Sequence, residues 1–220
     1  MIKICSFLVM ALSVIGCTFN HHDTAKFHND GTQKPSVMLA PMMGKASVDV
    51  SWSVKSEITD RIYNNLINAG QFYFPSDEGA LSYVLGKQDI SSCSDARMHD
   101  ITKSNFIVLV ELIDHKEVPY TGQVIKPIYP CDGKIGSVIM MTAMIKVLDM
   151  RGKKPKIVLH EVLYSNHLVE KAKSFADYTE NQYGSAIYKY TAYNMAHARL
   201  ANDIAKNVVK YIDFSIKANH

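Results

Sequence analysis

The sequence predicts an α+β fold: one domain with a mixed β-sheet packed by helices and a long C-terminal helix. Three observations support this. Continuous apolar, β-branched runs predict buried strands. Two later runs joined by "RGKKP" predict a hairpin, and apolar residues at intervals of three or four predict two amphipathic helices. Residues 35–214 show no internal repeat and no break in composition, so they are assigned to one domain.

The first half of this domain combines short strands and helices. "SVMLAP" (36–41) predicts a buried strand that ends at its proline. A helix is expected over residues 53–70, with Ser53 as N-cap and Gly70 just beyond its end. Its inner stripe is Val54, Ile58, Ile62 and Leu66. "QFYFP" (71–75) predicts a second strand, "DEGALSYVLG" (77–86) a short helix, and the stretch around Cys93 a loop.

The second half contains the longest predicted elements. "SNFIVLVELIDH" (104–115) is a clear strand, followed by an excursion rich in proline and glycine from Val118 to Gly136. Residues 137–150 and 156–166 are the two strands of the hairpin. A long helix is expected from about Ser185 to Phe214. Its inner stripe is Tyr193, Ala196, Leu200, Ile204, Val208 and Tyr211.

The N-terminus has the pattern of a secretory signal. Lys3 precedes an uncharged, mostly apolar run from Ile4 to Ile15, which is too short to span a bilayer as a helix. The run ends in "VIGC", which resembles the bacterial lipobox, with Gly16 at the small-residue position and Cys17 as the cysteine. The resemblance implies cleavage between Gly16 and Cys17 and acylation of the Cys17 thiol. The alternative is a plain signal with an incidental cysteine.

Domain boundaries follow from this interpretation. Residues 1–16 are the signal peptide, 17–34 the lipidated cysteine and a flexible tether, 35–214 the α+β periplasmic domain, and 215–220 a tail. In lipoproteins that the lipobox resembles, an aspartate after the cysteine favours the inner membrane. Thr18 stands there instead, so the resemblance implies a lipid anchor in the cell outer membrane with the domain in the periplasm.

Charge and cysteine content limit the classes of partner. The formal net charge of +3 falls to +2 when Lys3 is removed with the signal, and no basic stripe appears, so nucleic acid is not expected as a partner. Cys93 and Cys131 remain after lipidation of Cys17, and in an oxidising periplasm they could form a disulfide. Two free thiols are the alternative, because sequence spacing does not establish the required approach.

Sequence motifs for catalysis are missing. "HEVLY" at His160 has a tyrosine where a zinc protease needs its second histidine, and neither a G-x-S-x-G elbow nor a phosphate-binding glycine loop occurs. We therefore expect no enzymatic activity, no metal and no cofactor. Asp95, His99 and Asp100 could serve as acid, base and orienter, and an unrecognised envelope hydrolase is kept as an alternative on that basis.

Aromatic residues are concentrated in residues 175–193. Tyrosine combines an apolar face with a polar tip, so such clusters favour contact surfaces. The candidate partner contacts are Trp52, Tyr178, Tyr183, Tyr188 and Tyr190. The alternative is that these rings fill the junction between the C-terminal helix and the sheet, and Tyr193 in particular is predicted to lie in the core.

The order of elements resembles a family of periplasmic lipoproteins. The segments "VMLAPM", "LINAGQFYF", "IVLVELI" and "TAMIKVLDMRGKKPKIVLHEVL" precede a long terminal helix, as in penicillin-binding-protein activators of the LpoB type and the curli secretion lipoprotein CsgG. The chain also resembles uncharacterised lipoproteins of chlamydiae. The resemblance implies a non-enzymatic module that binds or regulates an envelope protein, such as a peptidoglycan synthase. An oligomeric secretion or pore component of the outer membrane is the alternative.

Overall fold

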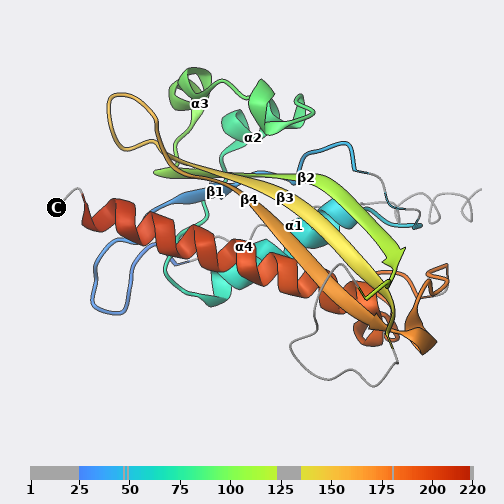
Figure 1. Cartoon of the computed structure of the whole chain (residues 1–220). Coiled ribbons are helices and arrows are strands. Elements are labelled where there is room, and N and C mark those ends of the chain that lie inside the picture. Colours follow the sequence, from blue (N-terminus) through green and yellow to red (C-terminus); the bar gives the residue numbers. More distant parts are fainter. Residues whose placement is uncertain (1–24, 47, 49, 123–134, 180, 219–220) are drawn as a thin grey trace, which may run out of the picture.

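The computed structural model describes residues 25–46, 48, 50–122, 135–179 and 181–218 (Figure 1). It has an α+β fold, as predicted, with four strands in the order β1-β2-β3-β4. The strands are β1 (Val37–Leu39), β2 (Phe106–Pro119), β3 (Ile135–Asp149) and β4 (Lys156–Glu170). β1 is parallel to β2, and the other two pairs are antiparallel, so the sheet is mixed.

Helices pack on both sides of this sheet. The α-helices are α1 (Val54–Asn68), α2 (Glu78–Leu85), α3 (Asp95–Ile101) and α4 (Ala192–Lys217), and the short 3-10 helices are η1 (Ile90–Ser92), η2 (Lys171–Lys173) and η3 (Tyr188–Tyr190). The long α4 lies beside α1 along one face, whereas α2 and α3 lie together on the other side (Figure 1).

The alternation of side chains along β2 explains why both faces are covered. Val108 and Val110 point into the large core that α1 and α4 complete, whereas Ile107 and Leu109 point into a smaller core with α2 and α3. A strand that is buried on both faces is apolar at consecutive positions. This is why "FIVLV" has no polar alternation.

A β-bulge near Ile113 changes which residues of β2 face α4. The register shifts between Leu112 and Asp114, and the side chain of Ile113 is left exposed. Because one extra residue reverses the alternation, His115 and Glu117 point to the same face as Leu112. The bulge therefore directs the imidazole of His115 into the core beneath α4.

The helix ends follow local capping rules. Ser53 accepts a hydrogen bond from the amide of Ser56 at 3.2 Å and begins α1, and Gly70 follows its end with φ of +68°, both as predicted. α4 begins at Ala192 rather than near Ser185, because Thr191 caps it and accepts from the amide of Asn194. The helix continues through Lys217, so residues 215–217 of the predicted tail are helical.

Three local predictions are wrong. "QFYFP" forms a single bridge, between Tyr73 and Ser36, instead of a strand. The segment is short because the turn at Gly70 precedes it and Pro75 ends it. The expected loop around Cys93 holds η1 and α3. β2 extends to Pro119 and β3 begins at Ile135, which shortens the excursion whose residues 123–134 lie outside the described ones.

Residues 25–34, the described part of the predicted tether, contain a tight turn: Asp30 accepts from the amide of Thr32 at 2.9 Å, and Gly31 has φ of +82°. Lys34 and Lys26 are joined across the turn by a backbone hydrogen bond of 2.8 Å.

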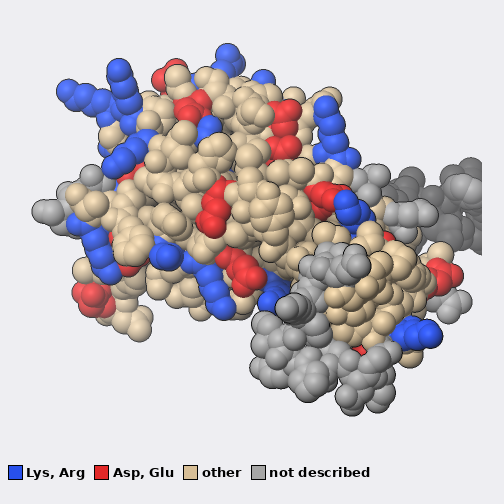
Figure 2. All heavy atoms as spheres, in the orientation of Figure 1, with Lys and Arg blue, Asp and Glu red and all other residues tan. Residues whose placement is uncertain are grey.

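The surface carries both signs of charge. On the face drawn in Figure 2, blue and red side chains are interspersed among uncharged atoms without a continuous basic stripe. Within the described residues, every helix is too short or too polar to cross a membrane.

Candidate functional site

Glu57 on α1 is the centre of a buried polar network. Its side chain is fully buried and accepts hydrogen bonds from four donors on different parts of the chain. The donors are Trp52 Nε1 at 2.9 Å, Arg61 Nε at 2.9 Å, Tyr188 Oη at 2.7 Å and His197 Nδ1 at 2.9 Å. The carboxylate therefore joins α1 to η3 and α4 and anchors the aromatic segment that lies between β4 and α4.

Two histidines extend this network to the sheet. The Nε2 atoms of His115 and His197 are 2.8 Å apart, so one must donate and the other accept. If each ring carries one proton, the carboxylate of Glu57 fixes the His197 proton on Nδ1, and His115 Nε2 is then the donor to His197. His115 Nδ1 is buried and has no hydrogen-bond partner among the described residues.

Electrostatics keep Glu57 ionised and His115 neutral. Burial by itself raises the pKa of Glu57, but hydrogen bonds and charge from His197, together with bonds from Tyr188 and Trp52, hold the pKa below its usual value. Burial, reinforced by the charge of His197, lowers the pKa of His115 to about 4. A neutral His115 can accept at Nε2 when His197 carries both of its protons, and it donates there when His197 is neutral.

Aromatic rings cover the network on its outer side. Tyr178 stacks on Tyr193 with ring centroids 4.1 Å apart, and Trp52 meets Tyr188 edge-on at 5.4 Å. Burial raises the pKa of Tyr193 to about 12. Tyr193 is buried, which confirms its predicted place in the core.

A smaller set of residues on the same segment faces solvent. Tyr183, Ile187 and Tyr190, which we call the 183–190 surface, have exposed fractions of 38%, 60% and 67%. Cations lie over two of the rings: Arg61 over Tyr183 at 5.7 Å and Lys189 over Tyr190 at 4.8 Å. An exposed apolar surface with cations beside it is suited to a partner that offers carboxylates next to apolar groups.

The five predicted contact residues differ in their exposure to solvent. Tyr178 and Tyr188 are 7% and 3% exposed, because their rings fill the space between the sheet and α4. Trp52 is half-buried, and its indole N–H is used by Glu57. Tyr183 and Tyr190 remain available to a partner.

The residues of the hydrolase alternative are not assembled into a catalytic group. Asp95 accepts from Lys146 Nζ at 2.5 Å, and His99 Nε2 lies 3.0 Å from the carbonyl oxygen of Gly152. The carboxylate of Asp100 is mostly exposed and 3.9 Å from His99 Nδ1. Asp95 is thus held by Lys146, whereas His99 and Asp100 lie beside each other. Within the part of the chain that the structure describes, no cluster of His, Cys, Asp or Glu has metal-binding geometry.

Three predicted sites on cysteines are untested by the structure. Gly16 and Cys17, the cleavage and lipidation site, lie outside the described residues, as does Cys131. Cys93 is buried in the smaller core with α2 and α3, and burial raises the pKa of its thiol. The disulfide between Cys93 and Cys131 stays a prediction.

Sequence reasoning missed Glu57, His115 and His197. Glu57 stands among helical positions that look solvent-facing, and His115 ends an apparently regular strand. One signal was available for His197, which directly follows Ala196 and lies one turn before Leu200 and Ala201, inside the apolar stripe of α4.

Comparison with known proteins gives the family. The sequence profile of a family of unknown function, DUF7499, matches residues 23–216. The chain belongs to this family. No match was found among curated proteins.

Solved structures were also compared with this chain. The hypothetical protein CT253 from Chlamydia trachomatis is 16% identical, with a TM-score of 0.65 over 81% of this chain and 98% of that one. At this identity the match shows a common fold, which confirms the chlamydial resemblance at that level. Lipoprotein GNA1162 from Neisseria meningitidis is 11% identical, with a TM-score of 0.39 over 78% and 99% of the two chains. The rare lipoprotein B from Shewanella oneidensis is 11% identical, with a TM-score of 0.32 over 84% and 99%.

Proposed function

We propose that this member of the family is a lipid-anchored lipoprotein of the cell envelope that binds an envelope protein and catalyses no reaction. The observation that carries the proposal is the lipobox-like "VIGC" directly after the apolar run Ile4–Ile15. Two or more acyl chains hold a protein on a membrane firmly, at about 0.8 kcal/mol for each buried methylene. Thr18 stands after the cysteine, where an aspartate favours the inner membrane in the lipoproteins that the lipobox resembles, and this supports our proposal of an outer-membrane anchor with the domain in the periplasm.

Metabolic labelling tests the anchor. Cells that express the full chain are grown with an alkynyl fatty acid, and label is compared between the wild type and Cys17→Ala. Label on the wild type alone is expected, because the thiol of Cys17 is the proposed acceptor. Absence of label from the wild type would contradict the proposal. Persistence of label in Cys17→Ala would place the lipid elsewhere.

The 183–190 surface is the proposed contact with the partner. Its exposed rings and the neighbouring Arg61 and Lys189 favour a protein that presents acidic side chains beside apolar ones. The buried network under it keeps the segment in place, so little conformational order has to be gained on binding.

Site-specific cross-linking tests this contact in the intact envelope. A photo-reactive phenylalanine replaces Tyr190 in one variant and Tyr164 in a matched control, since Tyr164 on β4 is also exposed. A discrete adduct at 190 that is missing at 164 and weakened by Lys189→Glu is expected. Equal adducts at both positions, or none at 190, would refute the contact.

A further inference from the structure

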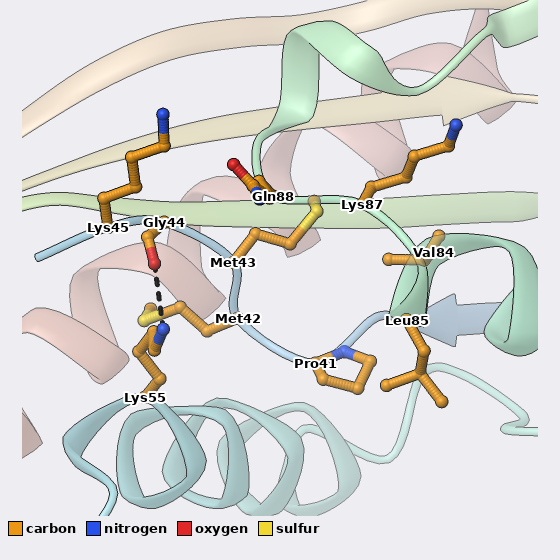
Figure 3. Close-up of a pocket in the computed structure, with 10 residues that line it drawn as sticks. All are labelled: Pro41, Met42, Met43, Gly44, Lys45, Lys55, Val84, Leu85, Lys87 and Gln88. Carbon is orange, nitrogen blue, oxygen red and sulfur yellow. Dashed lines mark hydrogen bonds between the residues drawn. The ribbon is translucent and has the colours of Figure 1, made fainter.

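A second surface, separate from the aromatic segment, is hollowed between α1 and α2. Two adjoining hollows of about 530 Å³ and about 260 Å³ share Pro41, Met42, Lys55 and Leu85 in their linings. We call them together the α1–α2 groove. Their combined size falls in the range of small-ligand sites. Figure 3 shows the smaller hollow, with Lys55 rising from α1 and Leu85 and Pro41 on the side toward α1.

On the side of the groove that faces the sheet, backbone hydrogen bonds hold the segment after β1 in place. The segment after β1 continues along β2, where Met43 N donates to Val110 O at 2.9 Å. Gly44 has φ of +113°, and a Cβ there would lie 2.2 Å from the carbonyl oxygen of Leu112, so only glycine allows this approach. Met42 N donates to Thr59 Oγ1 at 2.9 Å and ties the segment to α1. The groove is therefore preformed.

Apolar groups line the larger hollow. Leu39, Pro41, Met42, Leu81 and Leu85 contribute to it. Leu85 is 64% exposed, which is unusual for a leucine at the end of a helix that otherwise packs on the core. An apolar chain placed here would cover surface that the protein leaves in contact with water.

The charge around the groove is positive at one end. Lys45, Lys55 and Lys87 line the smaller hollow, and no acidic residue of the described chain does. Lys55 Nζ donates to Gly44 O at 2.8 Å and makes no ion pair within the described residues. Lys45 is partly balanced by Asp89, whose pKa it helps to lower, and Lys87 lies over the ring of Tyr83. Among the described residues, Asp60 is the one acid that lines the larger hollow.

These features together point to an amphiphile. We infer that the α1–α2 groove binds a single-chain amphiphile, with its apolar chain in the larger hollow and a carboxylate or phosphate head at Lys55. Lys55 lines both hollows and has donors left after its bond to Gly44, so it is placed at the boundary between head and chain. A fatty acid and a lysophospholipid share this chemistry. The inference concerns a different surface from the proposed protein contact and does not depend on it.

Photo-labelling of the mature full chain in proteoliposomes tests the inference. Three diazirine probes with the same 16-carbon chain carry a carboxylate, a lysophosphatidate head or a neutral alcohol, and labelled peptides are mapped by mass spectrometry. Labelling of peptides that contain residues 39–45 and 78–88 is expected for the two anionic probes, several-fold above the alcohol. Preference between the two anions identifies which head the site takes.

Two variants and a control make the result specific. Lys55→Met should lower anionic labelling of these peptides about tenfold, to the level of the alcohol, because a charge-assisted contact is lost. Leu85→Glu is at an exposed position and should lower labelling by all three probes. Lys153→Met, on the exposed turn after β3, should have no effect. The inference would be overturned if the three probes labelled these peptides equally and Lys55→Met had no effect. It would also be overturned if these peptides were not labelled.

Discussion

Glu57 on the α1–α4 face and Asp77 on the α2–α3 side are both buried carboxylates that accept from several donors. The two sets of donors differ in their distance along the sequence from the carboxylate. The donors to Glu57 include Tyr188 and His197, 131 and 140 residues away along the chain. Asp77 accepts from Thr102, Lys103 and Ser104, 25 to 27 residues away. Glu57 thus joins distant elements across the main core. Asp77 joins α2 to the end of α3, and the neighbouring α1–α2 groove is left open.

Glu57→Gln should have the largest effect on stability. The amide cannot accept from all four donors, and its own N–H₂ group opposes them, so buried donors lose their partner. We expect the free energy of unfolding to fall by about 3–5 kcal/mol. Asp77→Asn should cost less, about 1–3 kcal/mol. Denaturant unfolding of both variants measures the difference, and equal losses would remove the proposed contrast between the two sides.

Truncation of one leucine on α1 and one on α2 tests the same difference between the two sides of the sheet. Leu66 on α1 is fully buried, so Leu66→Ala should lower the free energy of unfolding by about 2–5 kcal/mol. Leu81 on α2 is only partly buried and lines the groove, so Leu81→Ala should cost less than about 2 kcal/mol. The same unfolding experiment reports both, and a larger loss at Leu81 would mean that the α2 side carries more of the stability.

Acid should weaken the α1–α4 side through His115. Its pKa is about 4 in the folded protein and near 6.5 when unfolded, so the unfolded state binds more protons between these values. Stability is therefore complete above pH 6.5 and falls as pH drops toward 4, by about 3 kcal/mol. His167, whose pKa burial also lowers, acts in the same direction. Glu57 has a lower pKa in the folded than in the unfolded protein, so its protonation lowers the free energy of unfolding further once the pH falls below its unfolded pKa.

The pH dependence of unfolding in the wild type and His115→Gln checks this prediction. The variant should have a shallower slope between pH 6.5 and 4, whereas Lys153→Met should keep the wild-type slope. An unchanged slope in His115→Gln would show that His115 is not the group responsible.

The smallest effect is expected at the open groove. Leu85 is exposed in the folded protein, so Leu85→Ser should change the free energy of unfolding by no more than about 0.5 kcal/mol. The melting temperature measured by circular dichroism is a sufficient test. A marked loss would show that Leu85 is covered in solution, for instance by another part of the chain.

The regular periodicity of the chain made most of the fold predictable. The stripe Ile58, Ile62 and Leu66 predicted α1, and the apolar run within 104–115 predicted a strand, which the structure buries on both faces over 106–110. The short elements were less predictable, because tertiary contacts decide them. "QFYFP" has strand composition but pairs through one residue, and α3 depends on Ser94 as its N-cap in a polar stretch.

The candidate site was predicted only in part. The concentration of tyrosines indicated the region, but composition does not distinguish rings that fill the core from rings that face solvent. Tyr183 and Tyr188 are five residues apart and have opposite environments because the chain turns at η3. His115 faces the core because of the bulge at Ile113, and Glu57 is joined to η3 and α4, and no local sequence pattern reveals either feature.

The proposed anchor is tested most directly by the mature N-terminus. The full-length protein is purified from envelopes in detergent and digested, and its N-terminal peptide is identified by mass spectrometry. The account predicts a peptide that begins at Cys17 and carries acyl groups. An unmodified peptide that begins after Cys17 would contradict the lipid anchor and, with it, the assignment of this domain to the cell envelope.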